Sequence, residues 1–192
     1  GQEVGYSEDS KNPAEFLINK YLKPGKNALT LKIFRWSTGS YLECQDFWRI
    51  SGIERDVFLW SQPKVALQDF RVISTLDDSY KQGIFKLAID LKSHLESAKD
   101  LTVSYELMDK AGKSIASETS NIWVSPSAPA TASFEKVLPE VASWSAETPN
   151  LYTLLMTIKE GDKVLEVIPY HVGFRRFEMK QTEEKAGNGK PY

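Results

Sequence analysis

Apolar and polar residues alternate at every second position in short runs along most of this chain, and this period is the feature that most restricts its fold. Every odd position from 85 to 91 and from 101 to 107 carries an apolar or aromatic residue. Helical spacing, with apolar residues three and four positions apart, is scarce. A strand that alternates in this way buries one face and exposes the other, so the pattern predicts an all-β fold of antiparallel strands.

Seven such runs follow Pro63, and turn sequences separate several of them. The clearest turns are Asp109-Lys110-Ala111-Gly112 and Glu160-Gly161-Asp162. Seven short strands in a region of this length are typical of an immunoglobulin-like β-sandwich, which we predict for residues 63–178. The predicted strands are 70–75, 84–91, 101–108, 114–118, 131–138, 152–159 and 164–174.

The residues before Pro63 differ in strand spacing and are predicted to form a separate domain, residues 1–62. Two strands are expected there, at 28–36 and at 56–60. The first follows a turn containing Pro24 and Gly25, where proline presets φ and glycine supplies a positive φ. The tail at residues 179–192 is charged and rich in glycine.

Charge and cysteine content exclude several classes of partner. The chain has 192 residues with 24 Lys and Arg against 26 Asp and Glu, so it lacks the basic excess that nucleic-acid binding requires. The single cysteine, Cys44, excludes an internal disulfide and a cysteine-based zinc site. No apolar run approaches about 18 residues, so no membrane partner is expected. The sequence does not identify the cellular compartment of the protein.

No catalytic residue emerges from the residue pattern. The two histidines, His94 and His171, are 77 positions apart and are predicted to be a solvated loop residue and a strand-surface residue. No nucleophile-elbow sequence accompanies them. Glycoside hydrolysis needs two carboxylates held roughly 5–9.5 Å apart, and the sequence alone does not identify such a pair.

The segment from Arg35 to Arg49 gathers aromatic, basic and acidic residues between two predicted strands. Ring faces cover the apolar side of a pyranose while acids and amides bond its hydroxyls, so this composition suits sugar recognition. The alternative is that the aromatic side chains fill the end of a sandwich. The residue types leave both readings open.

Two sets of long, ungapped motifs carry a family resemblance. The first set comprises Gly5-Tyr6-Ser7-Glu8-Asp9-Ser10, Pro13-Ala14-Glu15-Phe16, Arg35-Trp36-Ser37, Gly39-Ser40-Tyr41-Leu42-Glu43, Gln45-Asp46-Phe47-Trp48-Arg49, Ser51-Gly52-Ile53 and Arg55-Asp56-Val57. It resembles the sugar-binding jelly-roll domain of the large bacterial β-galactosidases of glycoside hydrolase family 2. The second set, Trp144-Ser145-Ala146-Glu147-Thr148-Pro149-Asn150-Leu151-Tyr152 and Val172-Gly173-Phe174-Arg175, resembles the end of that family's first immunoglobulin-like domain.

The resemblance implies a partial jelly roll in residues 1–62, a complete sandwich in 63–178 and a lead-in to a catalytic barrel in 179–192. The family's two glutamates lie in that barrel, beyond this sequence. We therefore expect a non-catalytic fragment whose parent, a bacterial homo-oligomer of cytoplasm or periplasm, hydrolyses terminal β-D-galactosides with retention. The alternatives are an autonomous carbohydrate-binding module, a structural spacer, or a fragment of a family 2 β-glucuronidase or β-mannosidase.

The resemblance also assigns one site residue, Asp46. The matching acid in the family is similar to a sodium ligand and a contact for galactose hydroxyls, and a hard cation suits a carboxylate oxygen. Sodium and magnesium are implied for the intact parent, and no cofactor for this fragment. The sequence departs from the family pattern at Thr38 and Cys44, where acids are expected, and at Glu54, where an aromatic residue is expected.

Two aromatic residues of the second motif set are expected to anchor the sandwich core. These are Trp144 and Tyr152. The hydroxyl of Tyr152 is expected to bond the backbone at a corner of the fold, as tyrosines of such sandwiches do.

Overall fold

The computed structural model describes residues 1–8, 12–42, 52–126 and 128–179. The chain divides into two compact units, Gly1–Leu59 and Trp60–Tyr192. Their described residues contain a 3₁₀ turn, η1 (Asn19–Tyr21), and one short helix, α1 (Gly39–Leu42). Neither of these two elements has the length and apolar content that a membrane span requires. Everything else that is regular is β-strand, so the predicted all-β class is confirmed.

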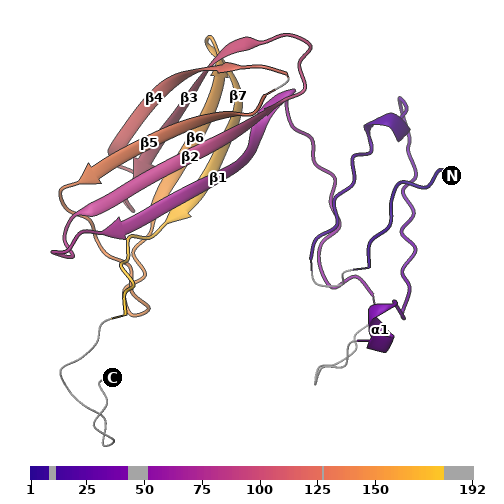
Figure 1. Ribbon diagram of the computed structural model, residues 1–192, viewed down its shortest axis with the longest axis horizontal. Coiled ribbons are helices and arrows are strands. Elements are labelled where there is room, and N and C mark those ends of the chain that lie inside the picture. Colours follow the sequence, from indigo (N-terminus) through magenta and orange to yellow (C-terminus); the bar gives the residue numbers. More distant parts are fainter. Residues whose placement is uncertain (9–11, 43–51, 127, 180–192) are drawn as a thin grey trace, which may run out of the picture. The chain divides into compact units, whose positions relative to one another are not determined.

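The second unit is a sandwich of two antiparallel sheets, as predicted (Figure 1). One sheet has the order β1-β2-β5 and the other the order β4-β3-β6-β7. The strands are β1 (Val65–Leu76), β2 (Gly83–Ser93), β3 (Lys99–Met108), β4 (Ser114–Val124), β5 (Ala130–Leu138), β6 (Tyr152–Glu160) and β7 (Lys163–Val172).

The alternating residues that predicted the strands also form the core. The odd-numbered side chains of 85–91 in β2 and of 101–107 in β3 are no more than 2% exposed. They come from different sheets, and their inward faces meet in one hydrophobic cluster. Each fully buried side chain of this size contributes roughly 1.5–3 kcal/mol of transfer free energy, so this cluster is the main source of the sandwich's stability.

The predicted turns join neighbouring strands. Gly112 has φ of 78° and Gly161 has φ of 57°, which is the left-handed region that glycine occupies without strain. In the β3–β4 turn the Asp109 carboxylate accepts hydrogen bonds from the backbone N–H of Ala111 at 2.8 Å and of Lys113 at 3.0 Å. The Asp109 side chain and the positive φ of Gly112 together stabilise the β3–β4 turn.

β1 and β4 exceed their predicted bounds by more residues than the other strands do. β1 begins at Val65 rather than 70, because a register shift between Leu67 and Asp69 interrupts the alternation that marks a strand. The half-buried Glu166 of β7 accepts the Leu67 N–H at 2.8 Å. β4 continues to Val124 rather than ending at 118, since its middle carries mostly polar side chains on an exposed edge.

The predicted hydrogen bond between the Tyr152 hydroxyl and the backbone is confirmed. Tyr152 is 7% exposed, and its hydroxyl oxygen accepts the backbone N–H of Ala142 at 2.8 Å. Trp144 is half-buried rather than a core anchor. Its ring lies against Gly173, and the guanidinium of Arg175 covers it at 5.2 Å from the ring centroid. Trp144 therefore closes the end of the sandwich, partly open to solvent.

The strands predicted at 28–36 and 56–60 are wrong. The described part of the first unit contains no strand, and its backbone hydrogen bonds outside α1 join residues three apart. The alternating side chains Leu29, Leu31 and Ile33 are each about half exposed. A strand needs a partner for its ladder, and the described residues of this unit offer none. Alternation of apolar and polar residues is therefore not enough to predict a strand in the first unit.

A tyrosine in the sandwich core gives a sharp stability prediction. Tyr105 is 1% exposed, and its hydroxyl has no hydrogen-bond partner among the described residues. Burial raises the pKa of this hydroxyl above its ordinary value. A buried unsatisfied polar group costs about 1–3 kcal/mol, so Tyr105→Phe should raise the free energy of unfolding, measured by urea denaturation.

Tyr152→Phe is the matched control for this prediction. It removes a hydroxyl that is bonded, so it should lower the free energy of unfolding by about 0.5–1.5 kcal/mol. The two Tyr→Phe changes are thus expected to have opposite signs. A Tyr105→Phe protein less stable than the parent would show that this hydroxyl is satisfied in solution.

Candidate functional site

The one predicted site residue, Asp46, lies outside the described residues, and so does Cys44. Asp46 belongs to the aromatic segment of residues 35–49, and the described part of that segment contains α1. The side chain of Tyr41 in α1 is 82% exposed. Trp36 is 50% exposed. These two rings do not fill a core in the described structure.

A small polar cluster in the first unit is centred on Glu8. Its carboxylate accepts hydrogen bonds from the hydroxyls of Tyr6 and Thr38, the latter at 3.0 Å. Both hydrogen bonds hold the pKa of Glu8 below its ordinary value, and the one from Tyr6 has the larger effect. The hydrogen bond to Glu8 in turn raises the pKa of the Tyr6 hydroxyl. Thr38 stands where the family resemblance leads us to expect an acid. A hydroxyl can donate to Glu8, whereas a second carboxylate would repel it.

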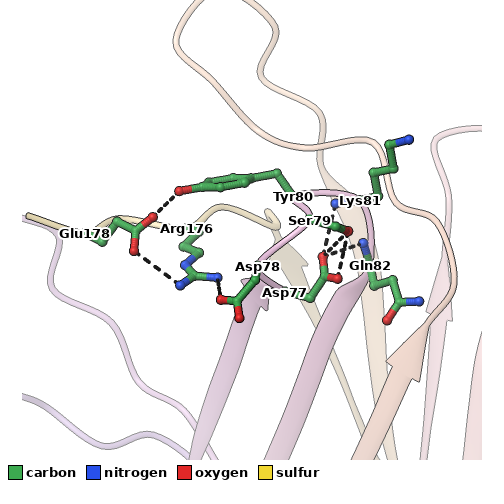
Figure 2. A network of polar contacts seen from close by, with 8 residues as sticks. All are labelled: Asp77, Asp78, Ser79, Tyr80, Lys81, Gln82, Arg176 and Glu178. Carbon is green, nitrogen blue, oxygen red and sulfur yellow. Dashed lines mark hydrogen bonds and ion pairs between the residues drawn. The ribbon is translucent and has the colours of Figure 1, made fainter. Parts of the chain in front are cut away.

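A network of polar contacts lies in the β1–β2 turn of the second unit, and Figure 2 shows it. Asp77 accepts from the hydroxyl of Ser79 at 2.7 Å and from the backbone N–H groups of Lys81 at 3.2 Å and Gln82 at 3.0 Å. The hydrogen bond from Ser79 contributes most to holding the pKa of Asp77 below its ordinary value, and the backbone N–H groups lower it further. One carboxylate thus organises the whole turn, in which Tyr80 has φ of 59°.

The same turn holds the segment that follows β7. Arg176 donates to Asp78 at 2.5 Å and to Glu178 at 3.2 Å, and its guanidinium lies 5.5 Å from the centre of the Tyr80 ring. The Tyr80 hydroxyl donates to Glu178 (Figure 2). The bond to Asp78 raises the pKa of Arg176. We call this set, Asp77–Gln82 with Arg176 and Glu178, the exit clamp, because it ties residues 176–178 to the β1–β2 turn.

The exit clamp has the chemistry of a structural contact. The acids Asp78 and Glu178 are each paired with Arg176, and Asp77 is satisfied by its own turn. An acid–base pair for glycoside hydrolysis would need one carboxyl with a raised pKa facing one that stays ionised. The pKa of Asp77, a carboxyl of the clamp, is lowered rather than raised. The clamp therefore orients the chain as it leaves the sandwich.

The clamp gives a pH prediction. The pKa of Asp77 is lowered in the folded chain, so its stabilisation is fully present above the ordinary aspartate pKa and is lost as pH falls through the lowered value. Asp77→Asn should lower Tm at neutral pH, and the difference from the parent should shrink as pH falls below the ordinary aspartate pKa. Thermal unfolding followed by circular dichroism at several pH values measures this. A difference independent of pH would contradict it.

The histidines lie where the sequence predicts. His94 is exposed in the β2–β3 connection, and His171 is exposed in β7. Among the residues that the structure describes, no three His, Cys, Asp or Glu side chains form a group that could hold a metal ion. The family resemblance names Asp46 as a sodium ligand, and Asp46 lies outside the described residues.

Comparison with known families covers nearly all of the chain. Residues 1–63 match the profile described as glycosyl hydrolases family 2, sugar binding domain. Residues 65–175, more than half of the chain, match the profile described as glycosyl hydrolases family 2. The chain belongs to glycosyl hydrolase family 2. The sandwich described above is the part that the second family 2 profile matches, and it is preceded by sugar-binding-domain sequence.

Curated relatives from three bacteria have the same name. The chain is 42% identical to a "Beta-galactosidase" of Priestia megaterium and 43% identical to one of Streptococcus thermophilus, each over 94% of its length. It is 35% identical to a "Beta-galactosidase" of Klebsiella pneumoniae over 98% of its length. The chain spans only 17–18% of the length of these three relatives.

Two solved structures are similar to this chain in fold. A β-glucuronidase of Bacteroides uniformis matches with a TM-score of 0.70 and 20% identity, over 83% of this chain and 20% of that one. A putative β-galactosidase of Bacteroides fragilis matches with a TM-score of 0.51 and 17% identity, over 64% of this chain and 18% of that one. At such identities the likeness concerns the fold alone.

Proposed function

We propose that this chain is a non-catalytic part of a family 2 β-galactosidase, in which it supplies sugar-binding-domain residues and a rigid linking sandwich. The observation that carries the proposal is the identity of 35–43% over at least 94% of the chain to proteins named β-galactosidase, of which it spans less than a fifth. The parent protein would hydrolyse terminal β-D-galactosides with retention of configuration.

The proposed domain division is residues 1–62, 63–178 and 179–192. It is supported by the family profiles, which meet between residues 63 and 65, and by the division into compact units at residues 59 and 60. Residues 179–192 are proposed as the lead-in to a catalytic barrel, and nearly all of them lie outside the described residues. Limited proteolysis should first cleave between the two units and in the tail, and early cleavage inside 65–172 would contradict the division.

The exit clamp supports the linking role. A sandwich that holds two domains in fixed relation must fix the direction in which the chain leaves it. Arg176 and Glu178 do this by binding a turn that is 98 residues earlier in the sequence. Because the Arg176 side chain is only 25% exposed and bonds two carboxylates, residues 176–178 are held against the sandwich.

Asp46 is proposed as the contribution of this chain to the active site of the parent. Its carboxylate would bind sodium and galactose hydroxyls together with groups from the barrel, and sodium and magnesium would be ions of the intact enzyme. The parent is proposed to be a homo-oligomer. The exposed rings of Trp36 and Tyr41, close in sequence to Asp46, are consistent with a segment that is covered by another part of the enzyme.

Two measurements on the purified 192-residue chain test the proposal. We expect no turnover of a chromogenic β-galactoside and no effect of Asp46→Ala on galactose binding measured by calorimetry. Saturable galactose binding at micromolar to low millimolar concentration that Asp46→Ala abolishes would instead identify an autonomous carbohydrate-binding module. Measurable hydrolysis by the chain alone would overturn its non-catalytic role.

A further inference from the structure

An exposed tryptophan on the outer face of the sandwich lies next to hydrogen-bonding side chains. Trp123 is 61% exposed in the edge strand β4, between the inward-facing Ile122 and Val124. Side chains two positions apart on a strand point to the same face, so Asn121 shares the outer face with Trp123. The Trp123 indole therefore offers its apolar surface to solvent beside a polar side chain.

The neighbouring strand places two more polar groups on that face. Asp100 of β3 is the register partner of Trp123, and Thr102 is the register partner of Asn121. Leu101 and Val103, which alternate with them, have buried side chains, so Asp100 and Thr102 point outward. The Thr102 hydroxyl donates to the Asn121 side-chain oxygen at 3.2 Å, which leaves the amide nitrogen of Asn121 as a donor toward solvent.

The polar side chains among them line a shallow hollow, and Trp123, the register partner of Asp100, adjoins this lining without being part of it. It has a volume of about 490 Å³ and is lined by Asp100, Leu101, Thr102, Asn121 and Gly161. Gly161 belongs to the β6–β7 turn and leaves the space beside it open, since nothing lies within 4 Å of where its Cβ would be. The hollow is open to solvent, so it would enclose a ligand only in part.

The chemistry of the hollow selects a neutral polyhydroxylated ligand. Carboxylate, hydroxyl and amide groups provide both acceptors and donors for sugar hydroxyls, and the Trp123 ring offers a flat apolar surface for the C–H face of a pyranose. Lys99 is paired with Glu160 beside the hollow, so that cation is already neutralised. The carboxylate of Asp100 in the lining disfavours an anionic ligand.

From this juxtaposition we propose a second, non-catalytic saccharide-binding site on the outer face of β3 and β4, with Trp123 as the stacking platform and Asp100, Thr102 and Asn121 as hydroxyl partners. The site takes a neutral pyranose. It lies on the sandwich rather than in the aromatic segment near Asp46, and it stands independently of the function proposed for the parent enzyme. An open hollow with few partners gives weak, millimolar binding.

The test is an NMR titration of the full 192-residue chain with lactose. The indole N–H of Trp123 and the backbone amides of Thr102, Asn121 and Gly161 should shift and saturate at millimolar sugar. Trp123→Ala and Asn121→Ala should each weaken binding by about tenfold or more, which corresponds to about 1.4 kcal/mol. Two controls, Trp36→Ala in the other unit and Val137→Ala on exposed β5, should leave the titration unchanged.

Three results would overturn the proposal. The first is the absence of any saturable shift at these residues. The second is a lactose response that Trp36→Ala removes and Trp123→Ala does not, which would place sugar in the aromatic segment. The third is a change of sedimentation coefficient in Trp123→Ala without any lactose response, since Trp123 would then be covered by a second copy of the chain.

Discussion

Phe174→Ala should lower the free energy of unfolding of the sandwich by about 3–5 kcal/mol, the largest effect expected of a single change here. Phe174 is fully buried just after β7. Its ring packs edge-on against Tyr152 with centroids 5.3 Å apart and lies 6.5 Å from Phe85 of the opposite sheet. Alanine would leave a cavity where the two sheets and the exit segment meet.

The matched control is Phe177→Ala. The same change is made three positions later on a side chain that is 89% exposed. Its effect should stay within about 0.5 kcal/mol. Thermal denaturation of both variants measures the contrast, and the Phe174 variant should melt roughly 10 °C lower or more. Equal small effects would show that Phe174 does not hold the end of the sandwich closed.

Gly83→Ala should cost about 1–3 kcal/mol, although it adds a single methyl group. Gly83 begins β2 and is buried. A Cβ there would lie 2.7 Å from a methyl of Val141 and 3.0 Å from the Phe174 ring. Neither neighbour is the flexible end of a long side chain, so the backbone or the ring must move.

A double-mutant cycle separates this clash from a backbone effect. In Gly83→Ala with Val141→Ala the nearest methyl is removed, so the combined loss of stability should be smaller than the sum of the two single losses. Urea denaturation of the four proteins supplies the coupling free energy. Strict additivity would mean that the space around Gly83 adjusts without cost, contrary to the packing described above.

The seven sandwich strands could be predicted because each strand's partners lie in this sequence. The odd residues of 85–91 and 101–107 show the period of two and also fill the core. The bonded hydroxyl of Tyr152 could be anticipated as well, from its place in a motif typical of sandwich corners. Here local pattern and tertiary packing agree, which is why the prediction held.

The same reasoning failed in the first unit for a physical reason. The residues from Leu29 to Ile33 have equally good alternation, yet their described structure has no ladder, because pairing depends on a partner that the pattern of one strand does not reveal. The exit clamp was missed for a related reason. Arg176 is 98 residues away from its partner Asp78, and no local signal in the sequence connects them.

The proposed role of this chain is tested by comparing the 192 residues with the protein encoded by the whole reading frame that contains them. Both are assayed with 4-nitrophenyl β-D-galactoside and with the corresponding β-D-glucuronide. We expect the longer protein to hydrolyse the galactoside in preference to the glucuronide, and the 192 residues alone to hydrolyse neither. Hydrolysis by the 192 residues alone, or a longer protein that prefers the glucuronide, would contradict it.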